Sequence, residues 1–508
     1  MSESRLKNSI RSTASGFINK IICMLFPFIT RTIIIKEIGI DYVGLNGLFT
    51  SILMVLSISE LGFGNAMVYS MYKPIAEKNN AKICALLNLY KKVFRYVGLF
   101  ILAAGLLIMP FLNFFVNGEC PEDINLYVLY LVFLVNTVIS YFAFAYKSAL
   151  LSADQREDIN NKVMMYVNIA MYIIQIILLI TLKNYMAYIV VLPIATLATN
   201  LIRSVIVDKM YPQYSCKGNL DKDELHSIYK NVGALVGHKI SGTIILSSDN
   251  IVISTVLGLT AVACYNNYYY IINSLVGFFM VYFNAIRPSI GNSLVTENVE
   301  KNYIDFKTIT IITAWLAGWC TICLICLFQP FIKIWIGNEY LLSTMTSILL
   351  PINFYVWKMV DTLILYRDAA GMWWSDRFRP YIVSIVNLIG NIILVKFFDL
   401  NGVVFATLFT YLCISYPWVL TILFKEYFKK NLFDYLKLIF GCTFSILIIG
   451  ALTYFAVSLI QGESWLNFLL KCVVCLVLPN TAFIFLFGRK KEVKQLVRKT
   501  FAKKKTVL

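Results

Sequence analysis

Long apolar stretches separated by short polar connections dominate this sequence. An α-helix needs roughly 20 mainly apolar residues to cross the hydrocarbon core of a bilayer. Fourteen such stretches follow one another along the 508 residues. We therefore expect an all-α polytopic membrane protein. Its spanning helices should lie near 13–35, 45–70, 93–117, 125–150, 163–183, 185–207, 231–257, 262–290, 308–330, 341–366, 379–398, 400–424, 435–460 and 465–487.

The composition agrees with a membrane protein. Hydrophobic residues make up 59% of the chain and charged residues 14%, whereas soluble domains have about 45–50% apolar and about 25% charged residues. The net charge of +17 does not require nucleic acid as a partner, because the basic residues gather in alternate loops and in the tail. Most of the twelve cysteines lie in apolar helices, so we expect no disulfide framework.

The charges of the loops predict the orientation in the membrane. One set of loops is rich in lysine, as around Lys82 and Lys222, and so is the tail 488–508. The opposite set is short and carries acidic residues such as Glu122 and Glu463. Because basic residues stay on the cytoplasmic side, we expect both termini in the cytoplasm.

Residues of the first half recur in the second half at a nearly constant spacing. At 219 residues Lys20 corresponds to Lys239 and Gly39 to Gly258, and at 220 residues Gly98 corresponds to Gly318. At the same spacing of 220, Tyr146 with Lys147 corresponds to Tyr366 with Arg367. Order and spacing together indicate an internal repeat, in which the helical pattern begins again after a connector.

The repeat predicts the division of the chain. We expect an N-lobe of six helices at 1–207, a cytoplasmic connector at 208–230 and a C-lobe of six helices at 231–424. Two extra helices at 435–487 and a basic cytoplasmic tail at 488–508 would follow. Six is an even number, so the two lobes would be parallel repeats, with the substrate site between them.

Several cations lie inside the apolar segments. Lys20 and Arg31 are eleven residues apart, which places them on one face of a helix and about 16 Å apart. His238 and Lys239 lie in the seventh segment and Arg287 in the eighth. Lys20, Arg31 and Arg287 could extend to the lipid headgroups instead of a cavity. Alternatively, these cations line a basic cavity for an anionic substrate such as a phosphate or pyrophosphate.

Two carboxylates also lie inside the apolar segments. Glu60 lies in the second segment and Asp249, beside Asn250, in the seventh. With a basic cavity, both would act as counter-charges or as carriers of a coupling proton or sodium ion. Glu60 could otherwise be a neutral acid or a structural partner of a cation, and Asp249 could make a polar contact between helices.

No motif of an enzyme is present. The chain has no P-loop, no HExxH and no nucleophile motif. A polysaccharide polymerase or ligase would need a sizeable external loop, and the sequence offers none. We therefore expect a carrier without a cofactor, driven by an ion gradient or by consumption of the product.

Two local patterns resemble a known family. Arg31 to Leu45, followed by Ser59 to Asn65, resembles the start of the Wzx-type flippases of polysaccharide repeat units. Ser248 to Gly258 is similar to the seventh helix of that family. These flippases belong to the multidrug/oligosaccharidyl-lipid/polysaccharide exporter superfamily, and the resemblance in helix pattern covers nearly the whole chain.

The resemblance implies a fold and a function. It implies two lobes forming a V around a central cleft, in which Lys20, Arg31 and Lys239 fit the cations that receive a pyrophosphate. It also implies translocation of undecaprenyl-pyrophosphate-linked oligosaccharide to the outer leaflet of the bacterial plasma membrane, for O-antigen, capsule or exopolysaccharide. Membrane lipids, a polysaccharide polymerase and chain-length proteins would be partners. Residues 435–487 would form a lipid groove, as in the related lipid II flippases.

The same fold allows a different substrate. A cation-coupled antiporter of drugs or small molecules remains the alternative, and it would favour an acidic cavity. Glu60 and Asp249 are the carboxylates that such a cavity would use.

Overall fold

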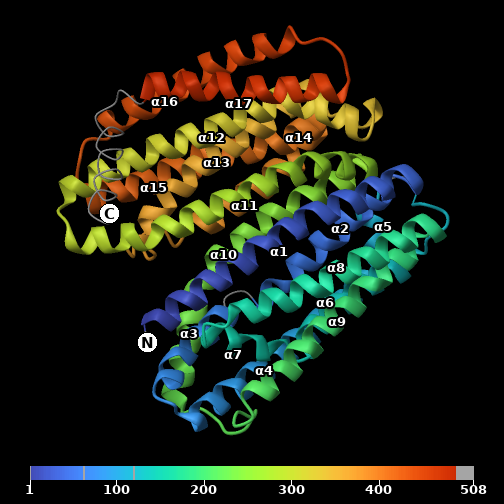
Figure 1. The fold of residues 1–508 in the computed structure, drawn as a ribbon, viewed down its shortest axis with the longest axis vertical. Coiled ribbons are helices and arrows are strands. Elements are labelled where there is room, and N and C mark those ends of the chain that lie inside the picture. The colour runs from blue at the N-terminus through green and yellow to red at the C-terminus, as the bar shows by residue number, and fades with distance from the viewer. Residues whose placement is uncertain (1, 61–62, 118–119, 488–508) are drawn as a thin grey trace. The chain divides into compact units, whose positions relative to one another are not determined.

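Every regular element of the described chain is a helix. The computed structural model describes residues 2–60, 63–117 and 120–487, and these contain helices and turns but no strand (Figure 1). Within these described residues, eleven helices are long and apolar enough to cross a membrane, or twelve if a bent pair counts as one span. The predicted all-α membrane fold is confirmed.

Contacts divide the chain into two compact units, Met1–Ala263 and Cys264–Leu508. The first unit contains the helices from α1 to α10 and the start of α11. They are α1 (Ser2–Glu37), α2 (Asp41–Leu56), η1 (Ser57–Glu60), α3 (Phe63–Ala76), α4 (Asn80–Ile108), η2 (Met109–Phe111), α5 (Leu112–Phe115), α6 (Leu126–Phe142), η3 (Ala145–Lys147), α7 (Ser148–Ala153), α8 (Glu157–Leu182), α9 (Tyr185–Met210), α10 (Lys222–Leu257) and α11 (Leu259–Thr296).

The second unit continues from α11. Its further elements are α12 (Val299–Trp335), η4 (Asn338–Tyr340), α13 (Thr344–Ala369), α14 (Arg379–Phe409), the π-helix η5 (Thr410–Ser415), α15 (Tyr416–Ile422), the π-helix η6 (Leu423–Phe428), α16 (Leu432–Ser458) and α17 (Trp465–Phe487).

Aromatic and small residues pack the first unit. The helix α1 lies along α8, and α6 lies between α4 and α9 (Figure 1). Phe49 of α2 is fully buried and meets Tyr130 and Phe133 of α6 edge-on, at ring-centroid distances of 5.4 and 5.6 Å. Gly105 of α4 lies so close to Leu134 that an added Cβ would approach that side chain to 2.4 Å. Large rings and glycines thus share one tightly packed core.

In the second unit, α12 is the central helix. It packs against α13, and the two C-terminal helices α16 and α17 lie along it (Figure 1). Gly318 makes this approach possible, because a Cβ there would come within 2.6 Å of Ile446 on α16. The two extra helices therefore belong to the second unit through direct packing on α12.

A sharp turn divides α14. Asp399 has a left-handed φ of 49° inside the assigned helix, and a Cβ on Gly402 would lie 2.2 Å from the carbonyl oxygen of Leu394. Asn387 donates a hydrogen bond to Thr407 Oγ1 at 3.0 Å across the turn. The chain therefore folds back at Asp399, in agreement with the two separate segments expected at 379–398 and 400–424.

Helix α10 begins inside the segment expected to be the connector. Asp221 stands at the N-cap position of α10, and its side chain makes no capping hydrogen bond. Residues 222–230, expected in the connector, already belong to α10. The first turn of that helix carries Asp223 and Glu224, which suit its positive end.

Two glycines related by the repeat have the same structural role. Gly39 follows α1 with a φ of +139°, and Gly258 follows α10 with a φ of +89°. Glycine accepts positive φ without a steric cost, so both positions allow a turn into the next helix. The spacing of 219 residues therefore marks equivalent turns.

The compact units differ from the predicted lobes in one helix. α10 belongs to the first unit, where it packs on α2. The predicted boundaries at 207 and 231 count this helix as the start of the C-lobe. They remain a prediction, because a division by contacts is not a test of the repeat.

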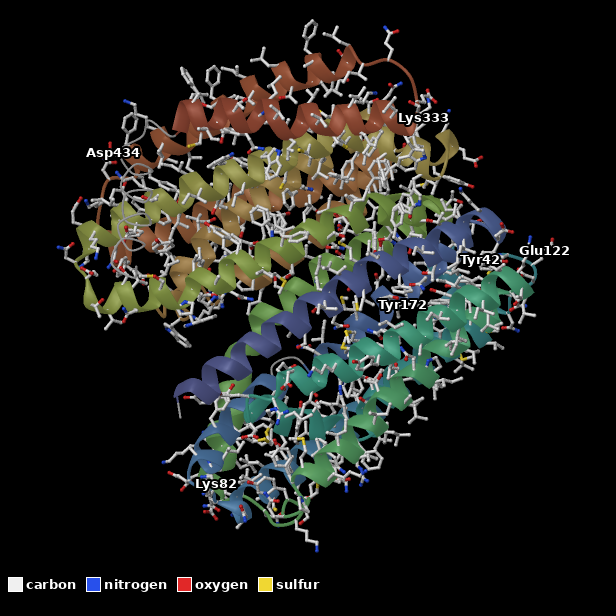
Figure 2. The ribbon with its side chains drawn as sticks, in the orientation of Figure 1. Tyr42, Lys82, Glu122, Tyr172, Lys333 and Asp434 are labelled. Carbon is white, nitrogen blue, oxygen red and sulfur yellow. The ribbon has the colours of Figure 1, made fainter. Side chains whose placement is uncertain are left out.

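Labelled charges mark the two ends of each unit. In the first unit, Tyr42 and Glu122 lie at one end and Lys82 at the other (Figure 2). In the second unit, Lys333 and Asp434 lie at opposite ends (Figure 2). The first unit follows the expected separation of acidic from basic loops. In the second unit the basic Lys333 lies at the end expected to face outside, so the orientation in the membrane stays a prediction.

Candidate functional site

Arg31 lies on the inner side of α1. Its side chain is half-buried and interacts electrostatically with Tyr185 and Tyr188 of α9. Tyr185 is buried and lies close to Asn46 of α2, whose Nδ2 is 3.4 Å from its hydroxyl. The Arg31 charge thus lies beside hydroxyl groups within the first unit.

Lys20 has a different environment. It lies on the same helix three turns earlier and is exposed. It acts electrostatically on Cys23, whose sulfur is 3.4 Å from the Asn168 amide of α8. The shared face predicted for Lys20 and Arg31 therefore holds one exposed and one half-buried cation.

Three of the predicted site residues cannot be placed in full. His238 and Lys239 belong to α10 and Glu60 to η1, but their side chains lie outside the described part of the structure. Arg287 is an exposed residue of α11 and acts electrostatically on Asp368 at the end of α13. The roles predicted for these four residues stay predictions.

Asp249 is a buried residue of α10 with 5% of its surface exposed. The adjacent Asn250 donates a hydrogen bond of 2.9 Å to Ser51 Oγ of α2. Asn250 thus makes a polar contact between α10 and α2. The predicted part of Asp249 as a counter-charge or proton carrier stays a prediction.

The first unit contains a cavity of about 500 Å³ with apolar and polar lining residues. Helices α1, α2, α6, α8 and α9 and the short helix η1 line it. Gln175, with 2% exposure, donates to the carbonyl of Tyr188 at 3.2 Å, while its Oε1 has no hydrogen-bond partner among the described residues. The polar lining consists of amides and hydroxyls, from Thr30, Asn46, Thr50, Ser57, Asn136, Thr137, Gln175 and Tyr188.

A buried ion pair lies near the middle of α13. Lys358 Nζ is 2.6 Å from Asp361 Oδ2, and the two side chains are 2% and 27% exposed. The ammonium lies 4.0 Å from the centroid of the Trp357 ring and 5.9 Å from those of Phe279 and Phe354. An aromatic cage and one carboxylate therefore hold a cation at the depth where charges are most costly.

This pair is not among the residues predicted from the sequence. Lys358 and Asp361 interrupt the apolar segment 341–366 three residues apart, so they share one face of the helix. The signal was the same one that identified Lys20 and Arg31, namely charge inside a spanning segment.

A second charged cluster closes the end of α13. Asp376 is fully buried between Arg367 and Arg379, at 2.9 and 2.7 Å. Arg379 also donates to Ser415 Oγ of η5 at 3.0 Å. The cluster therefore ties the 370–378 loop to three helical elements.

The repeat partner of Arg367 is also paired. Lys147 Nζ binds Asp208 of α9 at 2.6 Å and Ser204 Oγ at 2.8 Å. Tyr146 and Tyr366, which precede the two cations, are 4% and 2% exposed. Each half thus anchors the same Tyr-cation pair by a carboxylate.

The C-terminal helix α17 meets α12 through thiols. The thiols of Cys323 and Cys326 both lie within hydrogen-bond reach of Cys475, and Trp319 donates to the Cys475 carbonyl at 2.9 Å. These small groups fill the space between the two helices. All twelve cysteines are free.

Comparison with known proteins gives the family. The family of polysaccharide biosynthesis proteins matches residues 6–293. No curated protein matches the chain.

Solved structures share the fold. A lipid II flippase, MurJ, in an inward closed conformation is 17% identical with a TM-score of 0.67, over 94% of this chain and 99% of the other. An inward-facing MATE multidrug resistance transporter of the MOP superfamily is 14% identical, with a TM-score of 0.62 over 80% and 97% of the two chains. A MOP superfamily transporter from Pyrococcus furiosus, described as having a binding pocket of reverse polarity, is 14% identical. Its TM-score is 0.55 over 84% and 97%.

These likenesses extend over most of each chain, and the match to the family covers more than half of this one. The protein therefore belongs to the family of polysaccharide biosynthesis proteins, and it has the all-helical fold of MurJ and the MATE transporters.

Proposed function

We propose that this protein is a flippase for lipid-linked oligosaccharides. It would move undecaprenyl-pyrophosphate-linked repeat units from the cytoplasmic to the outer leaflet of a bacterial plasma membrane by alternating access. The product would enter the synthesis of a surface polysaccharide, with a polymerase and chain-length proteins as the next partners.

The observation that carries this proposal is the Lys358–Asp361 pair. A cation inside a spanning helix is costly and is usually retained for function. Lys358 is neutralised by a carboxylate that is itself partly exposed. A phosphate that approaches from the side of Asp361 could take over part of the interaction with the ammonium, because both are anionic acceptors.

The helix-embedded cations of the first unit support the same substrate class. Arg31 lies among tyrosine hydroxyls, and Lys20 is exposed on the same helix. A pyrophosphate carries several negative charges and accepts hydrogen bonds from both kinds of group. With His238, Lys239 and Arg287, these residues form the set that we propose for recognition of the headgroup.

An antiporter of cationic drugs is the alternative. The likeness to MATE transporters and the carboxylates Asp249 and Asp361 favour it. The cavity of the first unit favours neither substrate, since its lining contains no carboxylate and no lysine or arginine. A transport step driven by protons or sodium ions is compatible with either substrate, and we propose no further cofactor.

Transport by the purified protein tests the proposal. We would reconstitute it in liposomes with a fluorescent pyrophosphate-linked oligosaccharide lipid and measure its exposure to an external quencher. We expect wild-type protein to accelerate movement between the leaflets. Lys20→Ala, Arg31→Ala, Lys239→Ala and Lys358→Met should each slow it by about tenfold or more.

Controls separate the two functions. Lys396→Gln changes an exposed lysine of α14 outside the proposed set, and it should transport like wild type. If the protein does not move the lipid but exchanges a cationic dye for protons or sodium ions, it is an antiporter and the flippase proposal is wrong.

A further inference from the structure

A second cavity lies at the opposite end of the second unit from Asp434. Its volume is about 650 Å³, and it lies between the end of α12, the start of α13 and the connection from α16 to α17. Lys333, one of its lining residues, is at this end of the unit in Figure 2. The charges of the loops predict that this end faces the outside of the cell.

Two lysines supply the charge of this cavity. Lys333 forms an ion pair with Glu463, whose side chain is 64% exposed. Lys471 also lines the cavity and is partly buried, and no described residue forms an ion pair or hydrogen bond with its ammonium. Lys333 thus has an exposed carboxylate partner, whereas no described residue balances the positive charge of Lys471.

The position of Lys471 is unusual for a lysine. It lies six residues after Trp465 in α17, which corresponds to about 9 Å along the helix. Trp465 is 55% exposed and suits the interface between membrane and water. The backbone of Lys471 thus lies in the apolar part of α17, while its side chain lines the cavity. An anion bound there would stabilise the positive charge of Lys471.

Neutral polar groups complete the polar side. Gln329 is fixed by two hydrogen bonds, donating to the Leu342 carbonyl at 2.8 Å and accepting from Tyr268 at 2.9 Å. Ser343 and Thr344 begin α13, and both line the cavity. The N-terminal end of this helix adds a partial positive charge on the same side as the lysines.

The remaining wall is apolar and continues onto the surface of α17. Ile334 and Phe468 line the cavity, and next to Lys471 the side chains of Leu470 and Val473 are 48% and 55% exposed. A ligand that fits both parts has an anionic head and a hydrocarbon tail. The volume lies within the range of about 300–1,000 Å³ found for small-molecule sites.

We propose that this cavity binds the phosphate-bearing headgroup of a lipid in the outer leaflet, with Lys333 and Lys471 as its cationic ligands. The lipid tail lies along α17, and the head occupies the space between α12, α13 and α17. This proposal rests on the proposed flippase function and makes the cavity a station for the translocated lipid. Release of Glu463 from Lys333 accompanies binding, since the carboxylate competes with the phosphate.

Binding to the purified full-length protein tests this site. Native mass spectrometry of the protein in detergent would follow a polyprenyl diphosphate, phosphatidylglycerol and inorganic pyrophosphate as separate probes. We expect Lys471→Gln to weaken binding of the polyprenyl diphosphate by about tenfold, as the loss of one charged hydrogen bond implies. Lys471→Arg should restore it, and Glu463→Gln should strengthen it.

Lys396→Gln is the matched control, since it removes an exposed lysine from α14 in the same unit. Equal binding by Lys471→Gln and Lys396→Gln would overturn the proposal, provided that both variants melt at the wild-type temperature. Free pyrophosphate that binds as tightly as the lipid would also overturn it, because the tail would then contribute nothing. So would an equal affinity for phosphatidylglycerol in wild type and Lys471→Gln.

Transport distinguishes this inference from the proposed function. If wild-type protein moves the oligosaccharide lipid while Lys471→Gln leaves lipid binding unchanged, the flippase stands and the outer site is wrong. If wild-type protein moves no such lipid but binds polyprenyl diphosphate through Lys471, the site stands and the proposed function is wrong.

Discussion

Lys358 and Asp361 form an ion pair of 2.6 Å within one helix, and the lysine is almost completely buried. The two residues differ in exposure, because 27% of the Asp361 side chain is exposed. Removal of the carboxylate would leave a buried cation, whereas removal of the lysine would leave a carboxylate with access to solvent.

We therefore expect Asp361→Asn to destabilise the protein more than Lys358→Met. Loss of one partner from a buried ion pair costs about 3–5 kcal/mol, and Asp361→Asn should approach this range. The aromatic cage around Lys358 should accept a methionine at a lower cost. Thermal unfolding in detergent checks the order of the two variants. A larger loss of stability in Lys358→Met would contradict this account of the pair.

Asp376 should be indispensable for the end of α13. It is fully buried and binds both Arg367 and Arg379, so Asp376→Asn leaves two buried guanidinium groups short of a carboxylate. We expect a loss of about 3–5 kcal/mol in stability. Arg377→Gln is the control, since its guanidinium stacks on the exposed Trp374 at 4.2 Å. It should cost less than about 1 kcal/mol. Both can be measured by thermal unfolding, and similar melting temperatures would show that the cluster is not needed for folding.

Gly44 allows the close contact between α2 and the start of α11. An added Cβ would lie 2.2 Å from the Leu259 carbonyl oxygen, and backbone cannot move aside cheaply. Gly44→Ala should therefore destabilise the protein by roughly 1–3 kcal/mol or prevent its accumulation in the membrane. Gly242→Ala is the matched control, because a Cβ there meets nothing within 4 Å. It should be neutral or stabilise α10 by about 0.5–1 kcal/mol.

Cys120 offers a test of the predicted orientation. Its loop carries Glu122 and Asp123 and should face the outside, whereas Cys216 lies in the connector that should face the cytoplasm. In single-cysteine variants, a membrane-impermeant maleimide should label Cys120 in intact cells and Cys216 only in inverted vesicles. The opposite pattern would reverse the topology and would place the proposed lipid site in the inner leaflet.

Labelling of Cys120 should also depend strongly on pH. Burial and the neighbouring Asp123 raise the pKa of the Cys120 thiol above its ordinary value. The thiolate is the reactive form, so less of it exists at neutral pH and labelling should keep accelerating up to and beyond pH 9. A cysteine at the exposed position 122, in a variant without Cys120, should react faster at pH 7. Equal rates at that pH would show that the loop is more open than in this structure.

Much of the fold follows from patterns that are local in the sequence. The segment expected at 465–487 coincides with α17, because its apolar run has clear polar limits. The turn at Asp399 separates the two segments expected around it. The repeat spacing also identified equivalent turns at Gly39 and Gly258. The predicted first residues of helices were less accurate, and α12 begins at Val299 rather than near 308. Helices continue beyond their apolar segments, so hydrophobicity alone does not mark where they begin.

The candidate site was less predictable. Charge inside an apolar run marked Arg31 as unusual, but its neighbours Tyr185 and Tyr188 come from a helix more than 150 residues away. The clustered tyrosines at 265–270 contain one, Tyr268, that is fully buried and holds Gln329. A helix rotates by 100° per residue, so only packing decides which tyrosine faces a neighbour.

The sequence by itself determined that this is a helical membrane protein with an internal repeat and with cations in its spanning segments, because hydrophobicity and charge act through local composition. Only the tertiary structure decided how those charges are neutralised. It pairs Lys358 with Asp361, surrounds Asp376 with two arginines and leaves Lys471 facing a cavity. The cost of a buried charge depends on what surrounds it in space, and distance along the chain does not report those surroundings.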